Sequence, residues 1–174
     1  MLDHIAEHRD EILERWIDGV VDGYPEETAK FLRSKTDRFA NPVGAGLREG
    51  LAELLDGIIR GVEPEKFGSA LDRVIRVRAV QEFAPSSAVK FVFDLKDLVR
   101  EAVGDLRADP ENRSFDTIDN RIELLGLCAF DVYMSCREQM WAIRAREIRN
   151  QSVGIMERVA EWRERREENS ETHR

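Results

Sequence analysis

Residues 76–93, RVRAVQEFAPSSAVKFVF, are the stretch from which the fold of this chain is best predicted. The stretch begins with an amphipathic helical pattern and then passes through QEFAP, which is typical of a tight corner because a residue before proline avoids helical geometry. After Pro85 the apolar positions form the widest stripe in the chain. The stretch therefore predicts the end of one helix, a corner, and the start of the central core helix.

Helical periodicity continues on both sides of this corner, and no segment alternates as a half-buried strand does. Asn41 and Pro42 supply an N-cap and a first-turn proline for one of the helices. The predicted helices cover residues 5–24, 26–39, 42–60, 63–80, 85–106 and 114–149, with a loop at 109–112. The predicted fold is therefore all-α, with one domain of about six helices (1–149), a long last helix, and a charged helical extension and tail (150–174).

Three glycines, Gly44, Gly46 and Gly50, lie in the early turns of the predicted helix 42–60. Each costs roughly 1 kcal/mol of helix propensity relative to alanine. A cost of this size indicates that another backbone approaches this helix closely, because a glycine has no side chain to keep it away.

The composition excludes several classes of protein. A net charge of −8 disfavours nucleic acid as a partner, since phosphate binding needs a basic face. The start of the sequence does not resemble a signal peptide, and no uncharged apolar run approaches the length of a membrane span, so we expect a cytoplasmic protein without membrane insertion. Cys128 and Cys136 lie roughly 12 Å apart along one predicted helix, too far for a disulfide, and are predicted to be reduced core residues.

Polar and aromatic residues gather at the corner, namely Arg76, Arg78, Gln81 and Phe83. They form either a pocket for an anion or small ligand, or a polar switch whose charge biases helix packing. Alternatively, the two arginines pair with acidic residues of a neighbouring helix, for instance Asp94, Asp131 or Glu138, and pin two helices together. We favour pinning.

A second polar group lies on the long helix. Tyr133 and Arg137 are four positions apart, which places them on the same face. These two residues complete the pocket of the first group, contact a partner subunit, or form part of a solvated face. The sequence leaves all three possibilities open.

No constellation of residues predicts catalysis. His4 and His8 are four positions apart, but they lie near the terminus without an H-E-x-x-H arrangement, so we interpret them as surface histidines and expect no metal site. The third histidine, His173, lies in the tail, so a haem held by histidine is not expected. The sequence lacks G-x-S-x-G, P-loop and G-x-G-x-x-G motifs. We therefore expect no catalytic residues, no cofactor and no enzyme activity.

Apolar residues of the long helix follow heptad spacing, which is typical of a helix that pairs with another one. The spacing loses register because Met140 and Ile143 shift its phase and residues 150–152 and Gly154 interrupt it, and we expect a hinge there. A second seam begins at Ile148 and continues through Ile155, Val159 and Trp162. The predicted interface residues are Ile118, Ile122, Leu125, Val132, Ile155, Val159 and Trp162. This pattern predicts a homodimer or a partner protein on this helix.

Four segments of the chain occur together in a recognisable order: 24–25 (YP), 39–44 (FANPVG), 76–86 (RVRAVQEFAPS) and 133–138 (YMSCRE). In order and spacing they resemble the RsbRD N-terminal domain family, a sensory module named after the co-antagonist proteins of the bacterial stressosome. The resemblance extends from the first helix to about Arg149. The family favours serine before the corner proline, where this chain has Ala84, so Ser86 or Ser87 can supply only part of a helix cap.

The resemblance implies a helical, globin-like domain without haem that forms dimers and has a long last helix leading to an output module. A bundle-like arrangement of the same helices is the alternative topology. It implies a non-enzymatic role in signal transduction, in which a ligand or partner signal is relayed through that helix. Because no output module follows here, we expect a separate protein of the kinase or anti-sigma antagonist type, or a neighbouring complex, to receive the signal. The alternative is a scaffold or accessory subunit of a protein complex that senses no ligand.

Overall fold

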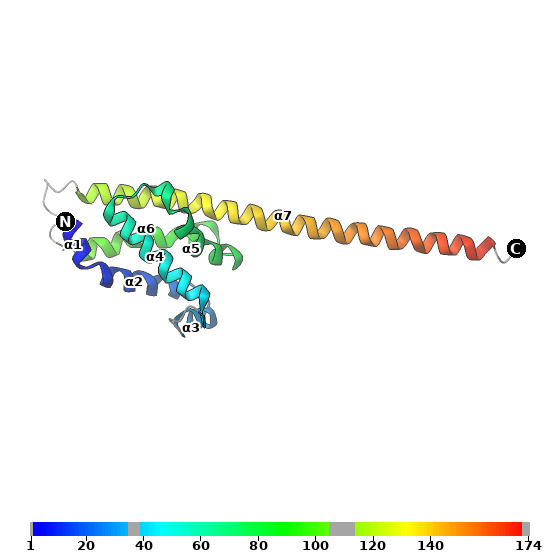
Figure 1. Cartoon of the computed structure of the whole chain (residues 1–174), viewed down its shortest axis with the longest axis horizontal. Coiled ribbons are helices and arrows are strands. Elements are labelled where there is room, and N and C mark those ends of the chain that lie inside the picture. The colour runs from blue at the N-terminus through cyan, green and yellow to red at the C-terminus, as the bar shows by residue number, and fades with distance from the viewer. Residues whose placement is uncertain (1, 35–38, 105–113, 172–174) are drawn as a thin grey trace. The chain divides into compact units, whose positions relative to one another are not determined.

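The structure is a computed structural model of the chain that describes residues 2–34, 39–104 and 114–171. All regular structure in these ranges is helical, which confirms the all-α prediction (Figure 1). The elements are α1 (Leu2–Glu7), α2 (Arg9–Asp22), α3 (Glu26–Ser34), α4 (Pro42–Arg60), the 3₁₀-helix η1 (Pro64–Phe67), α5 (Gly68–Val80), α6 (Pro85–Val103) and α7 (Ser114–Glu171). The predicted loop 109–112 and the predicted helical positions 35–38, 105 and 106 lie outside the described residues.

The chain forms two compact units, Met1–Cys136 and Arg137–Arg174. We refer to them as the helical domain and the extension. The division falls inside α7, ahead of the boundary after residue 149 that we expected from the sequence. Sequence periodicity could not locate this division because the same helix continues through it.

The predicted first helix is interrupted at His8, whose backbone (φ −96°, ψ 9°) separates α1 from α2. The His4 carbonyl accepts hydrogen bonds from the His8 backbone N–H at 3.2 Å and from the His8 ring nitrogen Nδ1 at 2.9 Å. A side chain that competes for a helical hydrogen bond is a common cause of a kink. α2 then ends at Asp22, before Pro25, as predicted.

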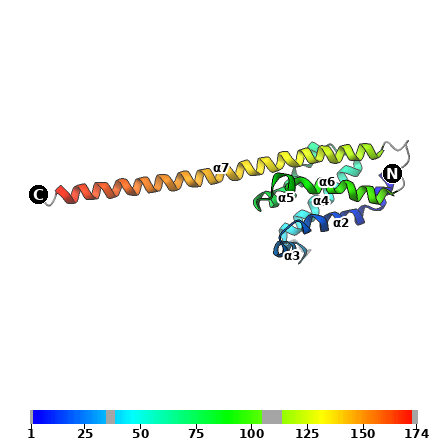
Figure 2. The same cartoon turned by 180° about the vertical axis from the view of Figure 1, so that it is seen from behind.

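The core of the helical domain lies between α2, α4, α5, α6 and the first part of α7 (Figure 1 and Figure 2). Leu51, Leu54 and Leu55 of α4 are as deeply buried as Val92 and Leu95 of α6. The predicted central helix α6 therefore shares the centre of the core with α4. α2 packs against both α6 and α4, and in Figure 2 α6 lies in front of α4.

The glycines of α4 meet the expectation of close approach at two of three positions. A Cβ atom on Gly44 would lie 2.8 Å from the Leu32 carbonyl oxygen, and one on Gly50 would lie 3.0 Å from the Ala70 carbonyl oxygen. The expectation is wrong for Gly46, where a Cβ atom would meet nothing within 4 Å. Gly44 and Gly50 therefore allow α3 and α5 to pack closely against α4. This close packing explains why both positions hold glycine although glycine lowers helix propensity.

The first part of α7 packs its heptad residues into the core of the helical domain. Ile118, Ile122 and Leu125 are at most 1% exposed, and Val132 packs against the same core. Our prediction that these residues belong to a dimer or partner surface is therefore corrected. Heptad spacing places residues on one face of a helix, but it does not distinguish a face covered by the same chain from one covered by another.

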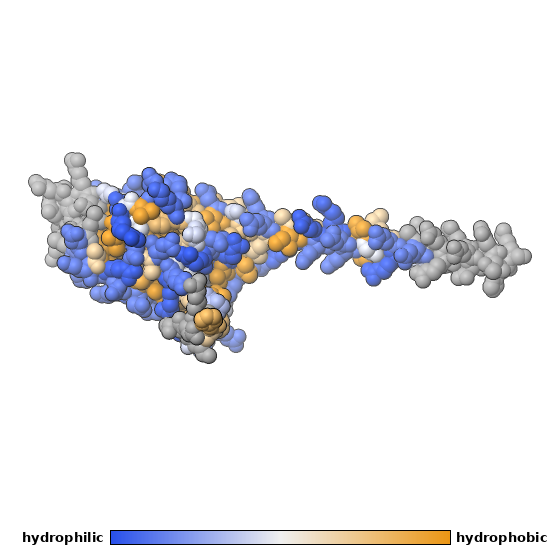
Figure 3. All heavy atoms as spheres, in the orientation of Figure 1, coloured by the Kyte–Doolittle hydropathy of each residue, from blue (hydrophilic) through white to orange (hydrophobic). Residues whose placement is uncertain are grey.

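The extension, considered by itself, is helical from Arg137 to Glu171. The hinge predicted around residues 150–154 is absent, because the helix continues through this described stretch. Gly154 lowers helix stability by only roughly 1 kcal/mol relative to alanine, so the helix tolerates it. Hydrophobic side chains alternate with hydrophilic ones along the described part of the extension (Figure 3). Trp141, Ile148, Ile155 and Trp162 are each more than half exposed. Within the predicted charged extension and tail (150–174), the side chains of residues 163–169 lie outside the described residues.

Candidate functional site

The corner after α5 is a helix-ending motif in which Glu82 adopts a left-handed backbone with φ of 59°. The Phe83 N–H donates to the Arg78 carbonyl and the Glu82 N–H donates to the Ala79 carbonyl, both at 3.2 Å. This pair of hydrogen bonds is the Schellman pattern, which usually places glycine at the left-handed position. The turn brings the Phe83 ring back over Arg78, whose guanidinium carbon lies 5.1 Å from the ring centroid.

Among the described residues of the helical domain, Arg78 is the buried cation, with only 3% of its surface exposed. Its Nη1 donates to the Ser87 carbonyl at 2.9 Å and its Nη2 donates to the Val20 carbonyl at 3.0 Å. The Val20 carbonyl lies in the last turn of α2, where a helix leaves carbonyls without intrahelical partners and attracts positive charge. Arg78 therefore joins α5 to the end of α2 and the start of α6.

Three aromatic rings surround this guanidinium, since its carbon lies 5.2 Å from the Tyr24 centroid and 5.1 Å from those of Phe83 and Phe91. Burial lowers the pKa of Arg78, while the neighbouring Tyr24 and Asp94 oppose the shift. Burial also raises the pKa of Tyr24, and the charge of Arg78 opposes that change. The arginine is thus held by carbonyl oxygens and ring faces, and the carboxylate pairing that we expected from Asp94, Asp131 or Glu138 is replaced by these contacts.

Tyr133 ties the long helix to the same corner. Its hydroxyl donates to the Phe83 carbonyl at 2.6 Å, and the residue is 2% exposed. Arg78, Phe83 and Tyr133 are thus brought together at the buried corner. This arrangement corresponds to pinning, which is the interpretation that we favoured from the sequence.

Arg76 lies on the outer side of α5, apart from Arg78. Its guanidinium forms two hydrogen bonds with the carboxylate of Asp72, at 2.7 and 3.0 Å, and this contact raises the pKa of Arg76. Cys136 Sγ lies 3.8 Å from the same carboxylate, and burial raises the pKa of this free thiol. Arg76 therefore pairs with an acid of its own helix.

A pocket of about 320 Å³ opens beside Arg76, between α3, α4 and α5. Apolar side chains form most of its wall, and the predicted residues Arg76 and Gln81 supply polar groups. The apolar residues of the wall include Phe31, Val43, Val77 and Val80. Sequence reasoning missed the apolar wall, although Phe31, Val43 and Val80 are apolar residues that remain exposed.

The six residues of the predicted cluster therefore separate into three places. Arg78, Phe83 and Tyr133 form the buried corner, whereas Arg76 and Gln81 border the pocket. Arg137 is the first residue of the extension. Sequence reasoning did not identify Tyr24 as a neighbour of Arg78. In the sequence, Tyr24 stood out only in the segment 24–25 (YP) that resembles the family.

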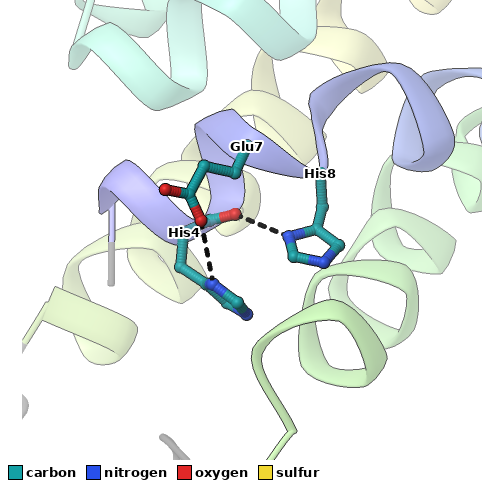
Figure 4. A group of neighbouring side chains, drawn as sticks. All are labelled: His4, Glu7 and His8. Carbon is teal, nitrogen blue, oxygen red and sulfur yellow. Dashed lines mark hydrogen bonds and ion pairs between the residues drawn. The ribbon is translucent and has the colours of Figure 1, made fainter.

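Among the described residues, the group that could hold a metal ion is His4, Glu7 and His8 at the junction of α1 and α2 (Figure 4). His4 Nδ1 lies 3.4 Å from a Glu7 carboxylate oxygen. In the part of the chain that the structure describes, no helix has the length and apolar character needed to cross a membrane.

Comparison with known proteins places most of the chain in one family. The family described as RsbT co-antagonist protein rsbRD N-terminal domain matches residues 10–148, which include the buried corner and the pocket. The chain is also similar to an uncharacterized protein of Archaeoglobus fulgidus, with 23% identity over 165 residues that cover 90% of this chain and 95% of that protein. No solved structure matches the chain. The family match confirms the resemblance that the four segments indicated.

Proposed function

Since the chain belongs to the family of the RsbT co-antagonist protein rsbRD N-terminal domain, we propose that it is a non-enzymatic regulatory domain of cytoplasmic signal transduction. It relays a ligand or partner signal through its last helix to a separate output protein of the kinase or anti-sigma antagonist type. Family membership supports the regulatory role, and the free thiols of Cys128 and Cys136 are in keeping with a reducing compartment. The observation that carries the relay is the pattern of exposed apolar residues on the extension.

These residues form a row at heptad spacing, which we call the extension row. Its members are Trp141, Ala145, Ile148, Ser152, Ile155, Val159 and Trp162, with gaps of four and three. Every member is exposed, and all except Ser152 are apolar. A helix with such a seam is stabilised by a second helix that buries it, so we propose that the extension pairs with a second copy of this chain in a coiled coil. Ile155, Val159 and Trp162 keep the role predicted for them.

The pocket beside Arg76 is the proposed place where a signal enters. Its volume of about 320 Å³ falls at the lower end of the range for small-molecule sites, and its apolar wall with few polar groups has the usual character of such sites. We propose an amphipathic ligand with an apolar body and a polar end that contacts Arg76 and Gln81. A thermal-shift screen of medium-chain carboxylic acids and alcohols tests this, because Val80→Trp should fill the pocket and abolish any stabilisation of the wild type.

The dimer is tested by light scattering of four proteins: the wild type, a chain ending at Arg146, and the double variants Ile148→Asp/Ile155→Asp and Ile143→Asp/Val153→Asp. Ile143 and Val153 are exposed apolar residues outside the extension row, so this last variant is a matched control. We expect a dimer for the wild type and the control, and monomers for the other two. A monomeric wild type would remove the basis for relay through a paired helix.

The alternative is a scaffold or accessory subunit, and the exposure of Ile143 and Val153 favours it. These side chains lie off the extension row and would stay exposed in a homodimer, where they are available to another protein. In this case the dimer should bind a hydrophobic dye, Ile143→Asp/Val153→Asp should remove that binding, and no ligand of the pocket should be found.

A further inference from the structure

The junction of α1 and α2 holds a second cluster of chemically capable side chains, His4, Glu7 and His8, and it lies ahead of the residues 10–148 that match the family. One possible ligand atom from each residue lies within 4.8 Å of those of the other two. The two imidazole centroids are 4.4 Å apart and the rings are inclined by 55° (Figure 4). We propose that this cluster binds one divalent transition-metal ion of the Zn²⁺ type, with the imidazoles of His4 and His8 as ligands.

One hydrogen bond and one charge contact of the cluster show which ring nitrogens face oxygen atoms. A carbonyl oxygen can only accept, so His8 Nδ1, at 2.9 Å from the His4 carbonyl, must carry the proton. His4 Nδ1 lies 3.4 Å from a carboxylate oxygen of Glu7, a contact between groups that can form an ion pair. Because Nδ1 faces an oxygen atom in each residue, Nε2 is the nitrogen of each ring that remains available to a metal. Fixing one ring nitrogen with an oxygen acceptor is the usual way in which proteins orient a metal-binding histidine.

The backbone holds the two rings near one another before a metal binds. The His8 N–H donates to the His4 carbonyl and the Ile12 N–H donates to the His8 carbonyl, so helical hydrogen bonds continue across the junction. Ile5, between the two histidines in sequence, is 1% exposed and anchors α1 in the core. The two histidines are four positions apart, which is the helical spacing that places both on the same face.

The donor set determines the class of metal. Two imidazole nitrogens favour borderline ions such as Zn²⁺, Ni²⁺ or Cu²⁺ over Mg²⁺ and Ca²⁺, which prefer oxygen ligands. Zn²⁺ bonds to imidazole nitrogen at about 2.0–2.1 Å, so small rotations of the two half-buried rings bring both Nε2 atoms to one ion. Glu7 is a positioning residue that keeps the His4 ring in place, and water supplies the remaining ligands. The ion would fasten α1 to the start of α2.

Isothermal titration of the full chain with ZnCl₂ tests the site. We expect one Zn²⁺ per chain, no binding of MgCl₂, and at least about tenfold weaker Zn²⁺ binding in His4→Ala and in His8→Ala. Glu7→Gln should weaken binding about 10- to 100-fold, the loss typical of removing a residue that orients a ligand. His173→Ala is the matched control, because it removes a histidine outside the described residues, and it should bind Zn²⁺ like the wild type.

Thermal unfolding supplies a second measurement in the same proteins. Zn²⁺ should raise the Tm of the wild type and of His173→Ala, and should leave the Tm of His4→Ala and His8→Ala unchanged, since an ion that binds the folded state stabilises it. Circular dichroism without metal checks that each variant is folded. Equal Zn²⁺ affinity in the wild type, His4→Ala and His8→Ala would show adventitious binding elsewhere and overturn the proposal. A wild type that binds no Zn²⁺ would overturn it as well.

Discussion

At the scale of single residues, two arginines that are separated by one position in the sequence have unlike roles. Arg78 is buried among three rings and donates to carbonyls of two other helices, whereas Arg76 is exposed and pairs with Asp72 on its own helix. A buried guanidinium contributes to stability because its hydrogen bonds replace those it loses to water. An exposed ion pair contributes little, because water already solvates both charges.

Arg78→Met is therefore expected to destabilise the helical domain by about 2–4 kcal/mol, since it leaves the Val20 and Ser87 carbonyls without their donor. Arg78→Lys should lie between the wild type and Arg78→Met, because an ammonium cannot reproduce the planar fork. Arg76→Met is the matched control and should change the free energy of unfolding by less than about 1 kcal/mol. Urea denaturation measures all three, and equal losses for Arg76→Met and Arg78→Met would contradict the clamp.

Substitutions of Glu82 by glycine and alanine test the left-handed backbone of the corner, because both remove the glutamate side chain. At φ of 59°, glycine is tolerated and alanine is strained, so Glu82→Gly should be more stable than Glu82→Ala by about 0.5–1 kcal/mol. The order should reverse at Gln81, whose φ is −82°, where alanine is preferred over glycine. Thermal or urea unfolding of the four variants compares the pairs. The same order at both positions would mean that the turn is not left-handed at Glu82.

At the scale of elements, Asn41 joins the end of α3 to the start of α4. Its Oδ1 accepts from the Gly44 N–H at 2.8 Å, which is the N-cap contact predicted from the sequence. Its Nδ2 also donates to the carbonyls of Phe31 and Leu32, at 2.9 and 3.2 Å, near the end of α3. One fully buried side chain therefore caps two helices.

Asn41→Ala should cost about 2–3 kcal/mol of stability, because it removes an N-cap and two further hydrogen bonds. Asn41→Asp separates the two functions of this residue. Aspartate is as good an N-cap as asparagine, so a simple cap would tolerate the change. Here the carboxylate would face two carbonyls without donating to them, and we expect a loss of at least about 1 kcal/mol in chemical denaturation. Wild-type stability of Asn41→Asp would contradict the double cap.

At the scale of the whole molecule, the proposed dimer couples association to stability. A folded state that associates is stabilised by mass action, so the Tm of the wild type should rise with chain concentration. Ile148→Asp/Ile155→Asp should have a Tm that does not change with concentration, because aspartates in the extension row prevent burial of the seam. Ile143→Asp/Val153→Asp should behave like the wild type. Differential scanning calorimetry at two concentrations a hundredfold apart measures the effect.

The candidate sites could be predicted only in part, because they depend on packing between helices that no local sequence pattern indicates. The residue types of the corner were recognised, but Arg76 and Arg78 are too close in sequence for their different surroundings to be foreseen. The pocket was missed because exposed apolar residues such as Phe31 and Val80 are ordinary on a protein surface until a wall forms between them. The histidine pair was interpreted from the sequence as surface residues without a metal site, because the contacts of its ring nitrogens follow only from the kink at His8.

The sequence by itself determined the all-α class, most helix boundaries and the family, because helical periodicity, proline, capping residues and short motifs act over a few neighbouring positions. Only the tertiary structure decided which apolar face each helix buries. Heptad spacing occurs both at Ile118, Ile122 and Leu125 and at Ile148 and Ile155, yet the first set lies in the core and the second is exposed. Burial depends on residues distant in sequence that come to cover a face, and a local pattern contains no information about them.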